Sequence, residues 1–345
     1  MSYNAIVLQQ YPEALIDDET FATQSFNEQP LQQGEFRVQV SHLSLDPAMR
    51  GWVSPDPSSY IPPVQLGEVM RSLGFGVVTE SLNENYPVGT QVTGMTGWTE
   101  QLIAKEGELS IVPQSVDAEM ALSVLGMPGL TAYLGYHDIL QAQQRQTQSQ
   151  QVSELQNGKP QTIVVTGAAG AVGSVVVQMA VADGLRVVAL AGSEDKVRWL
   201  KDELGVDAAI NYKTDNVAEA LTEATPDGID LFFENTGGEA QHTVIERMNP
   251  HGKVAVCGLI ADYHSATPAP APSWINLIKR RATIEGFVIT DHFYRAQELA
   301  AGIMPYLQQG KIQSRTHVLE GLEAAKAGVN MLYSGDNTGK LIVKL

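Results

Sequence analysis

The segment Ile163–Gly173, which reads IVVTGAAGAVG, constrains the fold of this chain more than any other part of the sequence. An apolar strand leads into a glycine-rich turn, and an apolar helical run, Ser174–Ala182, follows at once. In such a turn one glycine lets the backbone approach a pyrophosphate, a later glycine lets the helix pack on the sheet, and the helix N-terminus offers N–H groups to anionic oxygens. The segment therefore predicts a dinucleotide-binding turn made by Ala169, Gly170, Ala171, Val172 and Gly173.

The common fingerprint G-x-G-x-x-G is met only in part. Ala168 stands at its first position, ahead of Gly170 and Gly173, and Gly167 lies one residue earlier. A tight strand-to-helix turn that binds nothing is the alternative interpretation. The context favours the dinucleotide, because a second apolar strand, Arg186–Ala191, follows the helical run as a βαβ unit requires.

Two kinds of sequence pattern predict two domains. Short alternating runs such as Phe36–Val40 and Gly74–Thr79, separated by Gly and Pro, are typical of an antiparallel β domain. From Gln161 onward apolar strands alternate with helical patterns, which is typical of a doubly wound parallel α/β sheet. Its six strands are expected near residues 161–166, 186–191, 207–211, 229–233, 253–257 and 283–288.

The remaining segments complete this outline. We expect a helical run after about Tyr294, another over Gly321–Tyr333, and a closing strand, Lys340–Leu345, all returning to the first domain. The Gln-rich segment Gln141–Gln156 is polar and cannot bury a core face of its own, so it predicts a solvated helix end or a surface loop. The segment Thr267–Pro272, rich in Pro and Ala, predicts a stiff loop.

Composition and charge exclude several classes of partner. The formal net charge of −17 disfavours nucleic acid and anionic membrane surfaces, since both repel an acidic protein. Cys257 is the single cysteine, which rules out an intrachain disulfide and a cysteine-rich zinc cluster. The first residues lack the basic and apolar regions of a signal peptide, and no window holds the roughly 18 apolar residues of a membrane span. We therefore expect a cytoplasmic location and no membrane partner.

The residues after the second strand favour NADPH over NADH. An NAD enzyme usually carries Asp or Glu about 20 residues beyond the glycine turn, where it binds the ribose 2′-hydroxyl. Here Ala191, Gly192 and Ser193 occupy this place, and Lys196 follows. A small residue leaves room for a 2′-phosphate, a hydroxyl donates a hydrogen bond to it and an ammonium supplies the countercharge. The alternative is that Lys196 is a solvated lysine in the first turn of its helix.

The carboxyl ends of the later strands are expected to line the same crevice. They carry Asn211 and Tyr212, Glu234 to Gly237, Cys257 to Leu259, and Phe287 to Ile289. Asn235 and the pair Gly237 and Gly238 suit contact with a ribose or a nicotinamide, whereas turn formation explains each of these side chains equally well.

Several longer motifs resemble those of a known family. They are DPAMRGW (46–52), YIPPVQLGEVM (60–70), GMPGLTAY (126–133), VTGAAGAVGS (165–174), NYKT (211–214), ENTGGE (234–239), VCGLIADY (256–263), EGF (285–287) and SGDNTGKLIVKL (334–345). With these motifs the chain resembles the zinc-lacking medium-chain dehydrogenase/reductases, and within them the leukotriene B4 12-hydroxydehydrogenase and prostaglandin reductase branch, with bacterial NADPH-dependent curcumin reductase near it.

The resemblance carries expectations for the fold and the cofactor. It implies a GroES-like antiparallel β domain, residues 1–128 with 300–345, a Rossmann domain, residues 129–299, and a homodimer. It also implies that the glycine turn holds the pyrophosphate of NADPH, that Lys196 and Tyr212 contact its 2′-phosphate, and that Asn235 lies along the cofactor. On the nicotinamide side it places Cys257, Gly258, Tyr263, Phe287, Val288, Ile289 and Asn337. The Gln-rich segment is longer than the resemblance leads us to expect.

The sequence lacks a metal-binding set that would favour simple alcohol oxidation. Its seven His are scattered, no H-E-x-x-H occurs, and the Cys and His ligands of zinc alcohol dehydrogenases have no counterpart. Reduction of a carbon–carbon double bond conjugated to a carbonyl fits better. Hydride addition at the β-carbon leaves an enolate, which a hydroxyl donor can stabilise and protonate. We therefore expect a small apolar carbonyl substrate.

Two tyrosines are candidate proton donors, together with the nicotinamide ribose hydroxyl. Tyr263 follows the fifth strand, where its side chain can point into the cleft, and the resemblance also places a tyrosine there. Tyr60 lies in a Pro-rich loop of the first domain, with a rim or packing aromatic as the alternative. Arg50 is a candidate for contact with a phosphate or a substrate carboxylate, with an ordinary surface arginine as the alternative.

Three functions remain open at this stage. The leading one is an NADPH-dependent reductase of α,β-unsaturated ketones or aldehydes. An NADPH quinone oxidoreductase of the same fold would share the cofactor site. A non-catalytic protein that binds the dinucleotide as a structural ligand or redox sensor belongs to a different class.

Overall fold

The computed structural model describes residues 2–13, 15–17, 19–156, 159–263 and 270–345. The predicted loop Thr267–Pro272 therefore lies partly outside the described residues. The chain divides into two compact units, one of Met1–Gly126 with Ser314–Leu345 and one of Met127–Gln313.

The first unit is built on antiparallel strands, as its alternating runs predict. Its strands are β1 (Ser2–Leu8), β2 (Phe21–Asn27), β3 (Glu35–Ser44), β4 (Leu73–Ser81), β5 (Gln91–Met95), β6 (Gln101–Lys105), β7 (Leu109–Val112), β14 (Thr316–Glu320) and β15 (Lys340–Lys344). Seven of them form one sheet in the order β14-β15-β3-β4-β5-β7, with β6 paired to β3, while β1 and β2 pair separately. Only β14 and β15 within this sheet run parallel. The antiparallel character of this domain is confirmed.

Short helices complete the first unit. They are α1 (Met49–Trp52), α2 (Ala118–Leu122), α11 (Ala324–Gly328) and α12 (Met331–Ser334). The single helical run predicted over Gly321–Tyr333 is thus two short helices. The chain packs closely at the break, because a Cβ on Gly328 would lie 2.4 Å from Leu319 Cδ1.

The second unit has one parallel sheet of six strands. They are β8 (Thr162–Val165), β9 (Arg186–Ala191), β10 (Ala208–Asn211), β11 (Ile229–Glu234), β12 (Met248–Val256) and β13 (Thr283–Gly286). Their order is β10-β9-β8-β11-β12-β13, and every neighbouring pair is parallel. This is the doubly wound Rossmann arrangement, and the six predicted strands are confirmed to within a few residues.

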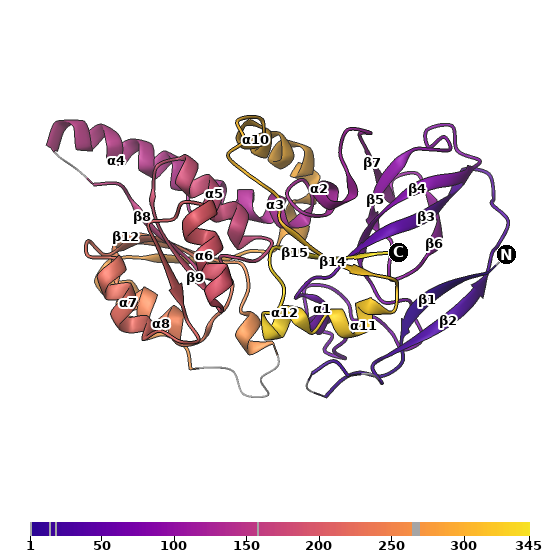
Figure 1. Cartoon of the computed structure of the whole chain (residues 1–345), viewed down its shortest axis with the longest axis horizontal. Helices are drawn as coiled ribbons and strands as arrows, with labels where there is room; N and C mark the ends of the chain where they lie inside the picture. Colours follow the sequence, from indigo (N-terminus) through magenta and orange to yellow (C-terminus); the bar gives the residue numbers. More distant parts are fainter. Residues whose placement is uncertain (1, 14, 18, 157–158, 264–269) are drawn as a thin grey trace. The chain divides into compact units, whose positions relative to one another are not determined.

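Helices cover both faces of this sheet. They are α3 (Met127–Tyr133), η1 (Leu134–Ile139), α4 (Ala142–Gln156), α5 (Gly173–Ala182), α6 (Glu194–Arg198), η2 (Trp199–Glu203), α7 (Val217–Ala224), α8 (Gly238–Glu246), η3 (Ile260–Asp262), α9 (Ile275–Arg280), η4 (Ile289–Arg295) and α10 (Ala296–Gln308). Figure 1 shows α7 and α8 side by side, and α5 packs against β8 and β9. Eight of the ten residues of α5 are buried, so its apolar composition reflects burial on all sides.

The Gln-rich segment forms α4, a helix of 15 residues, where we expected a solvated helix end or a surface loop. One glutamine makes this possible: Gln146 is buried, accepts a hydrogen bond from Gln161 N and donates one to Gly184 O. Hydrogen bonds of the Gln146 amide therefore hold this helix against the rest of the unit, a role that apolar side chains usually fill. Among the described residues, no helix combines the length and the apolar character that crossing a bilayer requires.

Helix α10 belongs with the second unit, although the predicted boundary assigned residues from 300 onward to the first. Its Tyr306 hydroxyl lies 3.0 Å from Asp183 Oδ2, and a Cβ on Gly302 would lie 2.2 Å from the Tyr133 ring. These close contacts hold α10 against α3, so the chain leaves this unit only after Gln313. Which segments fold as independent domains stays a prediction.

Candidate functional site

The sheet of the second unit reverses its strand order at β8, which has β9 on one side and β11 on the other. In open α/β sheets ligands bind at the carboxyl ends of the strands beside such a reversal. The segments predicted from the sequence to bind the cofactor in this unit all follow the carboxyl ends of its strands. The sheet therefore brings them to one edge.

The glycine turn after β8 is closely packed around Gly167. Gly167 has φ of +57°, and its carbonyl accepts a hydrogen bond of 2.9 Å from Gly170 N. A Cβ on Gly173 would lie 2.3 Å from that same carbonyl oxygen, and one on Gly170 would lie 3.1 Å from it. Gly167, rather than the Ala168 that the fingerprint aligned, therefore takes the position that needs a glycine. The turn has the close backbone approach that a pyrophosphate requires.

At Gly192, which follows β9, an added side chain would meet the ends of Tyr212 and Lys213. A Cβ on Gly192 would lie 2.6 Å from Tyr212 Oη and 3.2 Å from Lys213 Cε. Tyr212 and Lys213 thus close over Gly192, where an NAD enzyme would place its carboxylate. Tyr212 stays 40% exposed, and partial burial raises the pKa of its hydroxyl, so it is a neutral hydrogen-bond donor.

Ser193 and Lys196 lie at the start of α6. The Ser193 hydroxyl caps this helix by accepting a hydrogen bond from Lys196 N at 3.4 Å. The nearest acid in the sequence, Glu194, accepts a 2.7 Å bond from Asn211 Nδ2 and is engaged there. Tyr212 and Lys213 lie against Gly192, and Ser193 and Lys196 begin the helix that follows it. Hydroxyl and ammonium groups of this kind suit a 2′-phosphate.

Asn235, after β11, is tied to the last residue before the glycine turn. Its Nδ2 donates to Thr166 O at 2.7 Å, and its backbone N–H donates to Thr166 Oγ1 at 2.9 Å. A Cβ on Gly167 would lie 3.2 Å from Asn235 Cβ. The loop after β11 and the glycine turn are therefore in direct contact.

The segment after β12 folds back on itself. Tyr263 Oη accepts a hydrogen bond from Leu259 N at 3.4 Å and would lie 3.1 Å from a Cβ on Gly258. The phenol thus stays at the carboxyl end of the sheet and is 38% exposed. Burial, and next the charge of Glu234, raise the pKa of the Cys257 thiol to about 12. Cys257 is therefore a neutral neighbour of the crevice and no thiolate nucleophile.

The aromatic side chain of the strand end Phe287–Ile289 packs inside the second unit. The Phe287 ring packs edge-on against Phe233 with centroids 6.3 Å apart, and both rings cover Gly135. Ile289 is also buried. Contact between this segment and a nicotinamide would therefore use the backbone.

Three predicted site residues belong to the first unit. Arg50 is half-buried and donates through Nη2 to Pro12 O at 3.4 Å. Tyr60 is 59% exposed in the loop that follows α1. Asn337 is buried, and its Nδ2 donates to Gly339 O at 3.0 Å.

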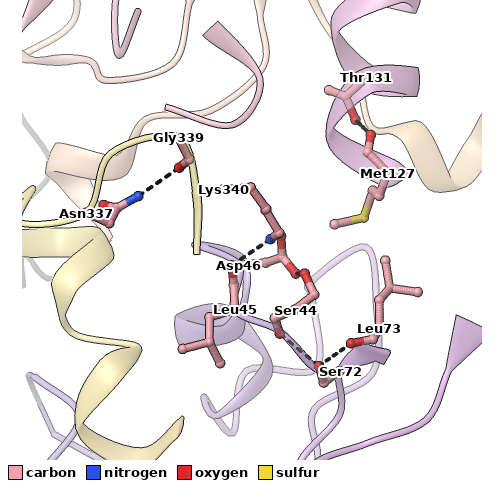
Figure 2. A network of polar contacts seen from close by, with 10 residues as sticks. All are labelled: Ser44, Leu45, Asp46, Ser72, Leu73, Met127, Thr131, Asn337, Gly339 and Lys340. Carbon is pink, nitrogen blue, oxygen red and sulfur yellow. Dashed lines mark hydrogen bonds and ion pairs between the residues drawn. The ribbon is translucent and has the colours of Figure 1, made fainter. Parts of the chain in front are cut away.

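A buried ion pair, Lys340 with Asp46, links the segment near Asn337 to the segment near Arg50. Lys340 Nζ donates to Asp46 Oδ1 at 2.6 Å and to Leu45 O at 2.7 Å. Figure 2 draws these residues as one network of polar contacts. Ser44 Oγ donates to the other carboxylate oxygen of Asp46. The pair joins β15 to the turn that leads into α1, and so it holds the two candidate segments of this unit to one another.

Sequence reasoning missed Lys213 and Thr166. Lys213 was quoted within the NYKT motif, and its positive charge beside Tyr212 was the available signal. Thr166 is a buried hydroxyl at the end of an apolar strand, and its significance comes only from partners far along the chain. Among the described residues, no group of three His, Cys, Asp or Glu side chains is placed to hold a metal ion.

Comparisons with known proteins agree over both units. Residues 4–112 match the family model described as the N-terminal domain of oxidoreductase, and residues 171–303 match the one described as zinc-binding dehydrogenase. Prostaglandin reductase 1 of Rattus norvegicus is 36% identical over 344 residues, which span 98% of this chain and 97% of that protein.

Two further relatives cover nearly the whole chain. NADPH-dependent curcumin reductase of Escherichia coli (strain K12) is 33% identical over 320 residues, 91% of this chain and 88% of that protein. The solved structure of CurA from Vibrio vulnificus in complex with NADPH has a TM-score of 0.89 at 36% identity, covering 99% of this chain and 98% of that one.

Proposed function

Because the chain belongs to the zinc-independent medium-chain dehydrogenase/reductases of the prostaglandin reductase and curcumin reductase type, we propose that it reduces the carbon–carbon double bond of α,β-unsaturated ketones and aldehydes with NADPH. The chain is an NADP-dependent oxidoreductase. The substrate class and the roles of individual residues are the content of the proposal.

The proposed cofactor site uses the residues at the carboxyl edge of the parallel sheet. The turn from Ala169 to Gly173 would hold the pyrophosphate, because its glycines leave no side chain in the way. Ser193, Lys196 and Tyr212 would hold the 2′-phosphate around the small Gly192.

The nicotinamide half would lie along the later strand ends. Asn235, Cys257 and Gly258 would line it, together with Tyr263 and the backbone of Phe287, Val288 and Ile289. For the first unit, we propose on the family resemblance alone that Asn337 binds the cofactor and that Arg50 and Tyr60 bind the substrate.

The reaction needs a hydroxyl donor beside the nicotinamide. When bound, NADPH supplies the hydride for the β-carbon of the substrate. We assign to Tyr263 the stabilisation of the resulting enolate oxygen and the delivery of a proton. The observation that carries this assignment is that the Tyr263 hydroxyl, on a side chain that is 38% exposed, accepts a hydrogen bond from Leu259 N in the segment that follows β12.

A panel of acceptors tests the proposal. NADPH oxidation is followed with enones, enals, quinones and saturated ketones, and each assay is repeated with NADH. We expect enones and enals to be reduced faster than quinones, saturated ketones to be inert, and NADPH to be preferred by at least tenfold in kcat/KM. Faster reduction of quinones would favour the quinone oxidoreductase. If no acceptor accelerates NADPH oxidation while NADPH still raises the Tm, the binding-only alternative replaces the proposal.

We also propose that the protein forms a homodimer through the edge of the parallel sheet. β13 is one of the two outer strands of this sheet, and unpaired edge strands readily pair with a second copy. The adjoining residues Trp274, Ile275 and Ile278 are exposed apolar side chains, 61%, 49% and 74% accessible. Light scattering should give twice the mass of the chain, and Ile284→Pro should give a monomer; a wild-type monomer would contradict the proposal.

A further inference from the structure

Glu234 is a buried carboxylate at the end of β11 that the proposed reaction does not use. Its side chain has no exposed surface. All of the hydrogen bonds recorded for the carboxylate go to Oε1, from Thr166 Oγ1 at 2.5 Å, Thr236 N at 2.6 Å, Gly237 N at 3.1 Å and Thr236 Oγ1 at 3.3 Å. Within the described residues Oε2 is buried and has no hydrogen-bond partner.

Thr166 connects Glu234 to Asn235 through hydrogen bonds of its hydroxyl group. Its hydroxyl donates its proton to Glu234 and accepts the backbone N–H of Asn235 at 2.9 Å. The Thr166 carbonyl accepts the side-chain amide of Asn235 at 2.7 Å. One carboxylate oxygen and one hydroxyl therefore set the conformation of residues 235–237 and tie it to the residue that precedes Gly167.

The hydrogen bonds among Thr166, Glu234 and Asn235 lie where the strand order of the sheet reverses. Thr166 directly follows β8 and Glu234 is the last residue of β11, and these two strands are neighbours in the sheet. A dinucleotide that crosses this reversal contacts the turn after β8 with its pyrophosphate and the loop after β11 with its nicotinamide half. The relative position of the two loops therefore determines how well both halves fit at once.

Stability alone does not explain a carboxylate in this place. Burying a charge with one oxygen unsatisfied is unfavourable, and burial is the main reason that the pKa of Glu234 is raised. A neutral side chain would fill the space at lower desolvation cost. Charge-assisted bonds to N–H and O–H groups are shorter and stronger than neutral ones, so a carboxylate holds the loop more rigidly.

We propose that Glu234 is a positioning residue that, through Thr166, holds the glycine turn and the loop 235–237 in the arrangement that binds NADPH. The inference rests on the NADPH site of the proposed function and adds two residues that do not themselves contact the cofactor. Preorganised loops bind more tightly because they lose less freedom when the ligand arrives.

The main test replaces the hydroxyl of Thr166. Thr166→Val keeps the shape of the side chain and removes the link, Thr166→Ser restores the hydroxyl, and Thr162→Val makes the same change at the other end of β8. The dissociation constant for NADPH is measured by its fluorescence, without enone. We expect Thr166→Val to raise it about tenfold, since a lost bond to a charged group has an effect of this order. Thr166→Ser and Thr162→Val should stay within about twofold of wild type.

Amide hydrogen exchange of the protein without NADPH supplies a readout independent of binding. The amides of Asn235, Thr236 and Gly237 should exchange faster in Thr166→Val and in Glu234→Gln, and at the wild-type rate in Thr162→Val. In turnover, Thr166→Val should raise KM for NADPH while kcat at saturation stays within about threefold, because the reacting groups are untouched.

Three results would overturn the inference. Thr166→Val could bind NADPH as tightly as wild type, Thr162→Val could weaken NADPH binding as much as Thr166→Val does, or Thr166→Ser could bind NADPH as weakly as Thr166→Val. Wild-type protein that binds no NADPH would overturn it as well. Because binding is measured without a substrate, the absence of enone reduction would count against the proposed function and leave this comparison of variants intact.

Discussion

Lys340 and Asp46, 294 residues apart in the sequence, form an ion pair of 2.6 Å between side chains that are only 2% and 6% exposed. Figure 2 shows that the pair is part of a network with Ser44, Leu45 and Ser72. Separating the two partners would leave an uncompensated charge in the interior, which is strongly unfavourable. The pair therefore links β15 firmly to the turn before α1.

Lys340→Met should lower the free energy of unfolding by about 3–5 kcal/mol, because it leaves the Asp46 carboxylate buried without a cation. The double variant Lys340→Met with Asp46→Leu should recover most of this loss, since no uncompensated charge remains. Denaturant unfolding measures both. Lys159→Met, at the exposed pair with Asp227, is the control and should lose at most about 1 kcal/mol. If both Lys→Met variants lose equally little free energy of unfolding, the buried pair stabilises the protein no more than the exposed pair.

Gly173→Ala should disrupt the glycine turn. Its Cβ would lie 2.3 Å from the Gly167 carbonyl oxygen and 2.9 Å from Ala168 Cα, both backbone atoms that cannot move aside cheaply. We expect a loss of about 1–3 kcal/mol of stability and at least tenfold weaker NADPH binding. Gly51→Ala, with open space around the new methyl group, should leave the Tm unchanged or raise it slightly. A Gly173→Ala variant with normal Tm and binding would refute the packing argument.

Lys196→Ala should raise KM for NADPH about tenfold and KM for NADH less than twofold, because only NADPH carries the 2′-phosphate that we propose the ammonium contacts. Steady-state kinetics with both cofactors measure the split. Lys201→Ala, an exposed lysine farther along the same helical segment, is the matched control and should change neither constant. Equal effects on both cofactors would remove Lys196 from the phosphate site.

Tyr263→Phe should lower kcat for enone reduction by about 10²-fold, the usual contribution of a positioned general acid, while NADPH binding changes little. Tyr60→Phe makes the same change at the other candidate and should affect KM for the enone more than kcat. If the two variants exchange these effects, Tyr60 is the donor. If neither lowers kcat, the nicotinamide ribose hydroxyl takes over the assignment.

His137 should make stability depend on pH. Burial lowers its pKa to about 4 from the usual 6.5, so the folded state stays neutral while the unfolded chain takes up a proton. This contribution is fully present above about pH 6.5 and is lost as the pH falls toward about 4, by up to roughly 3 kcal/mol. Denaturant unfolding at several pH values should show this slope in wild type and a weaker one in His137→Gln. His251→Gln, at an exposed histidine, should keep the wild-type slope.

Local patterns predicted the elements of the second unit well. The strands and the turn from Ile163 to Gly173 depend on periodicity and on glycine within a few residues, so a short window of sequence contains the information. The fingerprint nevertheless aligned Ala168 where the backbone uses Gly167, because two adjacent small residues look alike until φ is known.

The Gln-rich helix and the boundary near residue 300 were harder to predict. Composition shows that α4 lacks an apolar face, and only the fold shows that Gln146 finds buried backbone partners. Similarly, α10 has the pattern of any amphipathic helix, and its place is decided by Tyr133 and Asp183, far from it in the sequence.

The sequence by itself determined the class of fold, the glycine turn and the missing acid beside Ser193, because each depends on residue types close together in the chain. Tertiary structure decided which side chains lie beside the position of that acid, since Tyr212 and Lys213 close over Gly192. It also decided the pairing of Thr166 with Glu234, 68 residues away, and of Lys340 with Asp46. Such contacts arise when sheets bring distant strand ends together, and side chains that meet only after folding leave no periodic signal in the sequence.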